Sequence, residues 1–337
     1  AGSYLVKSAI GETIDNEALG GASMHSEISG VTDYKFDTDE ECLTHIRNIF
    51  DKMGGQATAG FSRAAPSKPR LDEQEIYGTL PADRAKPYDM MEIINRLVDN
   101  SEFEPYKDLY GQTLICGLAR IDGWAVGIVA NQRKIVKSKK TGMQMGGVIY
   151  SDSADKAARF IMNCNQKRIP LVFLHDVSGF MVGSASEQGG IIKDGAKMVN
   201  AMANSVVPKF TVIVGNSYGA GNYAMCGKAY DPRFIYAWPT AKIAVMGGGQ
   251  AAKTMLQIQV ATLKNKGEVI TPEVEQELLS KLIARYDAQT TAYYAGARLW
   301  VDAIIDPADT RKMISEGIAA ADHNPDIAEF KTGVFQV

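Results

Sequence analysis

The feature that most constrains this chain is a strand-to-helix transition rich in glycine, TVIVGNSYGAGNYAMCGKAY, which runs from Thr211 to Tyr230. Its apolar, β-branched start at residues 211–214 predicts a buried strand. Residues 215–221 predict a turn, and residues 222–226 predict the first turn of a helix. The first N–H groups of a helix have no acceptor within it, and glycine lets a ligand approach the backbone closely. The segment therefore predicts a site for a negative charge.

Similar transitions recur along the chain, and together they predict an α/β fold. Between about residues 112 and 260, short strand-like runs alternate with glycine turns and helix-like segments, which is typical of a unit with several parallel strands. Three strand ends carry glycine-rich turns, near Gly179, Gly219 and Gly247. Ligands of such sheets usually bind in the crevice at the carboxyl ends of the strands.

The length of 337 residues favours two domains, and composition suggests where they join. Residues 56–87 are rich in Ala, Ser, Pro and charge, which predicts a semi-rigid linker. Before it, Thr38, an acidic triplet and an apolar face that stops at Gly54 predict a helix. After it, the pattern predicts a helix near residues 91–98 and a hairpin around Asp122-Gly123.

Charge and composition argue against several classes of function. A net charge of −3 gives no reason to expect nucleic acid or a membrane surface as a partner. No apolar run has membrane-spanning length. The four cysteines and four histidines lack metal-ligand spacing, so we expect reduced thiols and no metal. The chain starts without an initiator methionine, as a fragment or a processed product would.

Within the same turn, residues 215–219 match G-x-S-x-G, the nucleophile elbow of hydrolases. Two acids and a histidine, Asp302, Asp306 and His323, follow it in chain order. The motif is short, such residues are common in a long chain, and no oxyanion segment of the HGGG type precedes it. A serine hydrolase that uses Ser217 is therefore a distant alternative.

Backbone groups offer a second interpretation of this turn. The N–H groups of Ala220 and Gly221 could form an oxyanion hole, and that chemistry needs no side-chain nucleophile. From the residues alone, a glycine turn that serves only tight packing is an equally good interpretation.

Two long stretches carry a resemblance to a known family: LVFLHDVSGFMVGSASEQGGIIKDGAKMVNA (171–201) and VPKFTVIVGNSYGAGNYAMCGKAYDPRFIYAWPTAKIAVMGGGQAA (207–252). They closely resemble the β (carboxyltransferase) subunit of biotin-dependent acyl-CoA carboxylases. The 3-methylcrotonyl-CoA type, which carries YGAGNYGMCG and VMGGEQAA, is the most similar variant. Shorter matches at residues 19–31, 87–89 and 297–311 extend the likeness over essentially the whole chain.

The resemblance implies a crotonase-like (ClpP/crotonase) fold of ββα units arranged as a superhelix. Subunits of this family have an N-terminal domain for acyl-CoA and a C-terminal domain for carboxybiotin. Residues 1–35 resemble the tail of the N-terminal domain, and residues 36–87 would form a helix and a Pro-rich linker. Residues 88–337 resemble a complete C-terminal, biotin-side domain.

The resemblance also implies an enzyme that moves CO2 from carboxybiotin, carried by a partner protein, to an acyl-CoA such as 3-methylcrotonyl-CoA. The N–H groups of Ala220 and Gly221 would stabilise the anion left on biotin, and biotin itself would take the acidic proton of the acyl-CoA. Decarboxylases of the glutaconyl-CoA type and carboxylases for propionyl- or geranyl-CoA share the fold and remain alternatives. A non-catalytic assembly partner is a further one.

The expected pocket for biotin and substrate comprises the turn and its facing wall: Gly219, Asn222, Tyr223, Gly179 and Phe180. Gly247 and Gly248 are expected to form a further glycine turn. The implied partners are a biotin carboxylase or biotin carrier subunit and further copies of the chain, as dimers within a hexamer. The implied compartment is the cytoplasm in a bacterium or the mitochondrial matrix in a eukaryote.

Overall fold

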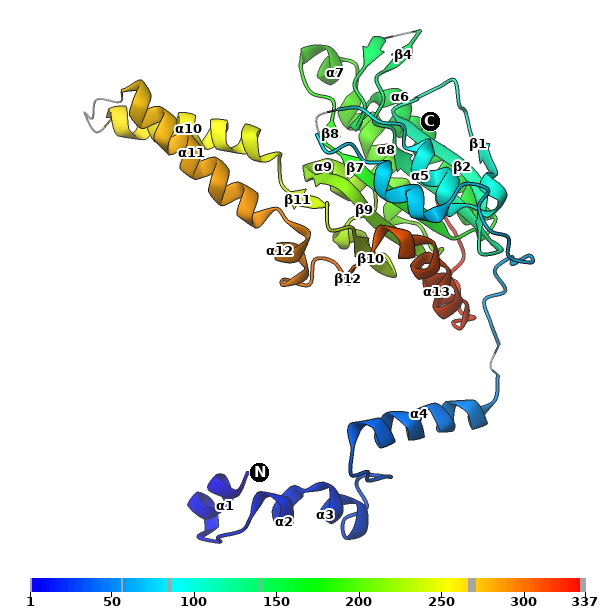
Figure 1. Cartoon of the computed structure of the whole chain (residues 1–337), viewed down its shortest axis with the longest axis vertical. Helices are drawn as coiled ribbons and strands as arrows, with labels where there is room; N and C mark the ends of the chain where they lie inside the picture. Colours follow the sequence, from blue (N-terminus) through cyan, green and yellow to red (C-terminus); the bar gives the residue numbers. More distant parts are fainter. Residues whose placement is uncertain (1, 56, 84–85, 140, 266–270, 334–337) are drawn as a thin grey trace. The chain divides into compact units, whose positions relative to one another are not determined.

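The computed structural model describes residues 2–55, 57–83, 86–139, 141–265 and 271–333, which fall into two compact units (Figure 1). The first unit ends at Ala57 and the second begins at Thr58. This boundary lies inside the stretch for which the sequence predicts a linker. It lies there because Phe61 and Ile76 are buried in the core of the second unit.

The first unit is helical in its described part. Its helices are α1 (Ser3–Ile10), α2 (Asn16–Gly20), α3 (Ala22–Glu27) and α4 (Asp39–Met53). Helix α4 confirms the helix predicted from Thr38 to Gly54: the Thr38 side chain accepts a hydrogen bond from the backbone N–H of Glu41, and Gly54 ends the helix at φ 80°. Three acidic residues in the first turn complement the positive end of the helix dipole.

The second unit is built on a mixed sheet with strand order β1-β2-β3-β7-β9-β10-β12 and with β11 beside β9. The strands are β1 (Phe103–Pro105), β2 (Leu114–Ile121), β3 (Trp124–Asn131), β7 (Leu171–Val177), β9 (Lys209–Tyr218), β10 (Phe234–Ala237), β11 (Lys242–Ala244) and β12 (Ala303–Ile304). Strands β1 to β3 pair antiparallel, and the pairs from β3 to β12 are parallel. The predicted hairpin around Asp122-Gly123 is confirmed as β2–β3.

Helices cover both faces of this sheet (Figure 1). The helices of the second unit are α5 (Met91–Leu97), α6 (Ser151–Gln166), α7 (Ser184–Gln188), α8 (Ile191–Ala203), α9 (Gly219–Ala224), α10 (Gly248–Asn265), α11 (Pro272–Gln289), α12 (Ala292–Gly296) and α13 (Thr310–Asp322). Two small sheets, β4 (Val136–Ser138) with β5 (Gly142–Gln144) and β6 (Val148–Ile149) with β8 (Gly179–Phe180), lie beside the main one.

Strand β7 shows why the core has two layers. All seven of its residues are buried, and successive side chains point to opposite faces. Val172 and Leu174 belong to the cluster with α5 and α13. Leu171 and Phe173 belong to the cluster with α6 and α8. A strand covered on both sides is mostly apolar, which explains the apolar run from Leu171 to Leu174 in the sequence.

Strand β9 is longer than the sequence predicts. Its first half pairs with β10, and Asn216 to Tyr218 pair with β11. The expected turn from Gly215 is therefore wrong in extent, because β11 supplies ladder partners for residues that look like a loop. As a result, the chain passes from strand to helix α9 between Tyr218 and Gly219.

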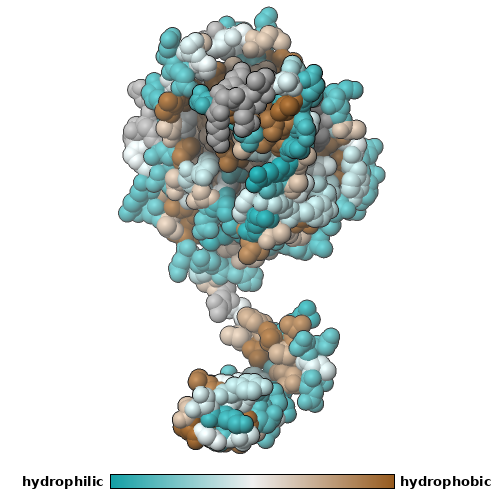
Figure 2. Space-filling model, turned by 90° about the vertical axis from the view of Figure 1, so that its left-hand side faces the viewer, coloured by the Kyte–Doolittle hydropathy of each residue, from teal (hydrophilic) through white to brown (hydrophobic). Residues whose placement is uncertain are grey.

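Helices α10 and α11 pack against each other through Ala252, Leu256 and Leu282 and extend away from the sheet (Figure 1). Figure 2, which views the side from which they extend, shows apolar patches among hydrophilic residues. No described helix is both long and apolar enough to cross a membrane.

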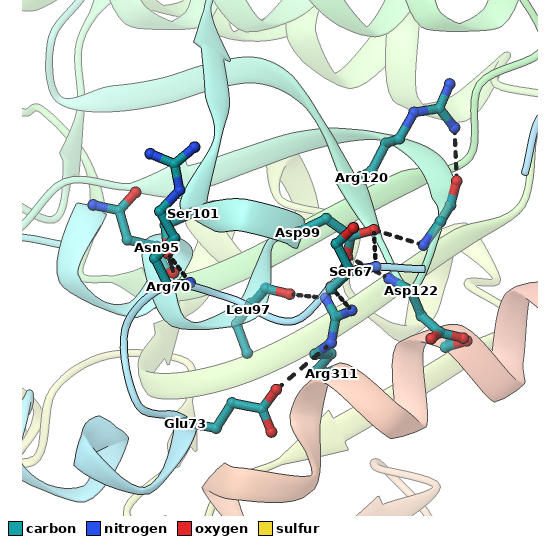
Figure 3. Close-up of polar contacts among 12 residues, drawn as sticks. Ser67, Arg70, Glu73, Asn95, Leu97, Asp99, Ser101, Arg120, Asp122 and Arg311 are labelled. Carbon is teal, nitrogen blue, oxygen red and sulfur yellow. Dashed lines mark hydrogen bonds and ion pairs between the residues drawn. The ribbon is translucent and has the colours of Figure 1, made fainter. Parts of the chain in front are cut away.

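An ion pair between Asp99 and Arg311 ties the segment after α5 to helix α13 (Figure 3). Arg311 Nη1 lies 2.6 Å from Asp99 Oδ1, and Nη2 donates to the Ser67 carbonyl at 2.7 Å. Asp99 also accepts hydrogen bonds from the backbone N–H groups of Asp122 and Gly123, both at 2.8 Å. The carboxylate thus fixes the β2–β3 turn, and the guanidinium fixes the segment before α5.

Candidate active site

The β9–α9 junction lies at one wall of a cavity of about 870 Å³. The other walls come from Phe180 and the residues after it, from helix α8, from β11 and from Trp300. The cavity is thus located beyond the carboxyl end of the central strand, as the sequence predicts for this type of sheet. Its volume falls within the range of small-molecule sites, roughly 300–1,000 Å³.

Gly219 makes the abrupt change from strand to helix possible. Its φ is +51°, which L-residues with side chains rarely adopt, and a Cβ there would lie 2.7 Å from the carbonyl oxygen of Val245. Gly221 is required for a different reason, which is close packing. A Cβ on Gly221 would lie 2.6 Å from Cγ2 of Val177 and 3.1 Å from Cα of Gly179. Helix α9 therefore packs directly on the strand behind it.

The predicted pocket residues divide into two groups. Gly219, Ala220, Asn222, Tyr223 and Phe180 line the cavity. The other glycines singled out in the sequence are not lining residues: Gly221 and Gly179 pack against each other, and Gly247 and Gly248 stand at the start of α10.

The cavity is mostly apolar, with a few polar groups on the β9–α9 side. Phe180, Ile191 and Val245 are typical of its walls, and Glu187 is the one carboxylate among the described lining residues. The first N–H groups of α9 face no side-chain cap from Tyr218, the residue before the helix. Uncapped N–H groups at a helix start can stabilise a developing negative charge, and they do so more strongly where bound substrate excludes water.

Ser217 lines the cavity wall but is itself fully buried and hydrogen-bonded on both sides. Its Oγ lies 2.9 Å from Nδ1 of His175 and accepts a hydrogen bond of 2.8 Å from Nδ2 of Asn222. His175 stands on β7, and its Nε2 bonds the carbonyl oxygen of Met225. Burial lowers the pKa of His175 to about 4, although the hydrogen bond to Met225 acts in the opposite direction.

The acids and the histidine that follow Ser217 in the sequence do not join it. Asp302 accepts a hydrogen bond of 2.7 Å from the backbone N–H of Ile235. Asp306 caps the short helix after it by accepting from the N–H of Ala308. His323 is exposed at the end of α13. The order Ser, Asp, His therefore does not correspond to a triad in the fold.

His175 and Asp176 follow the apolar run of β7, and their partners are not evident from the sequence. The two side chains point to opposite faces of β7, and Asp176 accepts hydrogen bonds from the Tyr88 hydroxyl at 2.9 Å and the Asn216 N–H at 2.8 Å. Asp176 therefore holds the segment before α5 against the last residues of β9. A local pattern cannot identify partners that lie 40 or more residues away.

The buried cysteines are poor nucleophiles. Burial raises the pKa of Cys116, Cys164 and Cys226 to about 12, so each remains a thiol at neutral pH. Over the ranges that the structure describes, no three His, Cys, Asp or Glu side chains form a group that could hold a metal ion. The polar groups that line the cavity are the backbone at the start of α9 and the side chains of Glu187, Ser217, Asn222, Tyr223 and Tyr230.

A family model described as the carboxyl transferase domain matches residues 1–334. The chain is 44% identical over 336 residues to the biotin-dependent 3-methylcrotonyl-coenzyme A carboxylase beta1 subunit of Mycobacterium tuberculosis, with 100% of this chain and 61% of that protein covered. It is 43% identical over 343 residues to the mitochondrial methylcrotonoyl-CoA carboxylase beta chain of Arabidopsis thaliana, with 100% and 56% covered.

A solved structure agrees with these sequence matches. The beta subunit of geranyl-CoA carboxylase from P. aeruginosa superposes with a TM-score of 0.78 at 37% identity, over 100% of this chain and 60% of that one. The predicted crotonase-like α/β fold is thereby confirmed. The chain spans between 56% and 61% of the length of these three relatives.

Proposed function

The chain belongs to the carboxyl transferase domain family, and on this premise we propose that it is the biotin-side part of an acyl-CoA carboxyltransferase. The full-length enzyme would move a carboxyl group from carboxybiotin to an acyl-CoA such as 3-methylcrotonyl-CoA. The observation that carries the proposal is the cavity at the end of β9. The uncapped start of α9 lies at its wall, and the carboxyl transferase family model matches the chain without interruption across this region.

Ala220 and Gly221 are the second and third residues of helix α9, so their N–H groups have no acceptor within the helix. We assign them to the stabilisation of negative charge during carboxyl transfer. Biotin, carried by a partner, supplies the carboxyl group and a urea oxygen on which such charge develops. Two preorganised donors suit this task because they are in place before the charge forms and need no reorganisation.

The side chains around these amides suit a bicyclic urea with an apolar arm. Phe180 and Tyr223 offer flat apolar surface on two sides of the cavity, and Asn222 adds an amide next to the helix start. The ring of Phe180 lies over Gly195 of α8, where a Cβ would come within 2.9 Å of Cε1. Apolar walls with few polar groups are the usual composition of a specific small-molecule site.

Partners are part of the same proposal. Val182, Ile192 and Val245 all line the cavity, and each is more than 70% exposed in the single chain. Exposed apolar groups at a cavity mouth favour docking of another protein. We propose a biotin carrier subunit or domain there, and homo-oligomers of the full-length protein as dimers within a hexamer. The compartment would be the bacterial cytoplasm or the mitochondrial matrix, according to the source cell.

The decisive experiment uses the full-length gene product, free biotin and a panel of carboxyacyl-CoA and acyl-CoA thioesters. Carboxyl transfer between a carboxyacyl-CoA and biotin is the expected result, and the thioester preferred by kcat/KM identifies the acyl group. Transfer with no thioester of the panel would overturn the proposal. Covalent labelling of Ser217 by a fluorophosphonate would instead favour a hydrolase.

A further inference from the structure

His175 lies at the centre of a chain of hydrogen bonds behind the cavity. Its side chain is fully buried on β7 and does not line the cavity. One ring nitrogen contacts the Ser217 hydroxyl at 2.9 Å, and the other contacts the Met225 carbonyl. Through Ser217 the chain reaches Asn222, whose side chain does line the cavity.

The chemistry of these groups fixes the direction of every bond. The Met225 carbonyl can only accept, so Nε2 of His175 carries the hydrogen and Nδ1 is the acceptor. The Ser217 hydroxyl therefore donates to Nδ1, and its oxygen accepts from Nδ2 of Asn222. The other end of that amide, Oδ1, faces Gly227, where a Cβ would lie 1.9 Å away. A single arrangement satisfies all the groups.

The two residues that His175 contacts flank helix α9. Ser217 lies two residues before its first residue, and Met225 immediately follows its last. A helix of six residues has little stability of its own, so its direction depends on what holds its ends. Here one ring on a central, fully buried strand holds both.

We infer that His175 is a positioning residue, which as a neutral imidazole clamps both ends of α9 and orients the Asn222 amide. The clamp aims the N–H groups of Ala220 and Gly221 into the cavity. This role rests on the proposed function of those N–H groups. Burial keeps the pKa of His175 near 4, so the ring retains its acceptor at neutral pH. An imidazolium would have no acceptor for the Ser217 hydroxyl.

Two substitutions at His175 separate hydrogen bonding from bulk. In His175→Gln, the side-chain NH2 can donate to Met225 and the side-chain oxygen can accept from Ser217, whereas His175→Leu fills the space with neither group. Thr211→Val is the matched control. It removes another buried hydrogen bond from β9 to the segment after α9, that of 2.7 Å to the Cys226 carbonyl, but does not touch Ser217 or Asn222.

The measurements are kcat and KM for carboxyl transfer by the full-length protein, together with urea unfolding of each variant. We expect His175→Leu to lower kcat by about tenfold to a hundredfold, as a misaimed reacting geometry does, with the KM for acyl-CoA within about threefold. We expect His175→Gln to recover most of kcat. Thr211→Val should unfold at lower urea and keep the kcat of the wild type.

Wild-type kcat in folded His175→Leu would overturn the inference, and so would a His175→Gln variant as slow as His175→Leu. If His175→Leu does not fold, Ser217→Ala takes its place, since it removes the link to Asn222 and keeps the bond to Met225. Unchanged kcat in Ser217→Ala would then overturn the inference. A wild-type protein without carboxyl transfer would overturn the proposed function, and the role of His175 with it.

Discussion

The β2–β3 hairpin and the β9–α9 junction both turn the chain sharply in buried surroundings. At the hairpin, Asp99 accepts hydrogen bonds from the two turn amides, and Arg311 neutralises it (Figure 3). At the junction, His175 and Ser217 are neutral, and they bond side chains and a carbonyl rather than the first amides of the helix. The hairpin therefore uses its turn amides to stabilise the fold, whereas the proposed site at the junction requires that the first amides of α9 stay unpaired.

This difference has an electrostatic reason. A buried carboxylate next to the first amides of α9 would occupy them permanently and would repel an incoming anion. Neutral hydrogen bonds from His175 and Ser217 hold the same backbone without competing for it, because they add no charge next to the first amides of α9. We therefore expect substitutions at the hairpin to change the free energy of unfolding, and substitutions at the junction to change the reaction rate.

The largest effect is expected from Asp99→Ala. It leaves Arg311, whose side chain is 11% exposed, with only the more distant carboxylate of Glu73 at 3.7 Å, and it leaves two turn amides unpaired. Loss of one partner of a buried pair typically costs about 3–5 kcal/mol of unfolding free energy. Urea denaturation measures this cost, and carboxyl transfer per folded molecule should be unchanged.

Glu102→Ala provides the control for the loss of a carboxylate. Glu102 pairs with Arg70 on the surface, where their side chains are 66% and 71% exposed. We expect little change in its urea midpoint, because exposed pairs are screened by water and salt. If Asp99→Ala unfolded at the same urea concentration as Glu102→Ala, the hairpin would not depend on its buried charge.

The next largest effect is expected from Ala220→Pro, which removes one N–H from the junction. Proline is tolerated in the first turn of a helix, so the fold should persist. Carboxyl transfer should fall by about 10²–10³, the usual cost of one preorganised oxyanion donor. Ala220→Gly keeps the N–H group and should remain close to the wild type. Equal rates in the two variants would remove Ala220 from the site.

The pH dependence of stability tests the neutral character of the junction. Burial depresses the pKa of His175 from 6.5 to about 4, so between these values the unfolded chain binds a proton that the folded chain does not. Stability should therefore fall as the pH drops from about 6.5 towards 4, by on the order of 3 kcal/mol from this group. The His175→Gln variant should lack this component, and the difference between the two urea-unfolding profiles isolates it. Parallel profiles would mean that the ring takes up its proton in the folded state.

Local signals in the sequence predict much of the fold but little of the difference between the hairpin and the junction. Thr38 and Gly54 bound α4 as expected, and Asp122-Gly123 marks the hairpin, because caps and tight turns depend on the residues themselves. The family resemblance also led to the cavity-lining residues Ala220 and Asn222. The extension of β9 to Tyr218 was missed, since it depends on pairing with β11.

Contacts between distant residues explain the remaining gaps. His175 and Ser217 are 42 positions apart, and nothing in either neighbourhood indicates that a histidine on one strand bonds a serine on the next. The Asp99–Arg311 pair joins two distant segments of the second unit in the same way. Such pairs are consequences of strand order and register, and a single sequence predicts those poorly for long connections.

The smallest effect is expected from Arg63→Ala, and it tests whether burial or charge governs the hairpin. Arg63 Nη2 lies 2.6 Å from Asp122 Oδ2, close to the turn that Asp99 holds, but the two side chains are 42% and 34% exposed. A partly hydrated pair contributes up to about 1 kcal/mol, so the urea midpoint should shift far less than in Asp99→Ala. Arg63 also lies over the ring of Trp124, so Arg63→Lys, which keeps the positive charge, should recover part of the loss. If Arg63→Ala lowered the free energy of unfolding as much as Asp99→Ala, any charge at the hairpin would stabilise it, whether buried or exposed. The hairpin would then differ from the neutral junction by its charge alone and not by the burial of that charge.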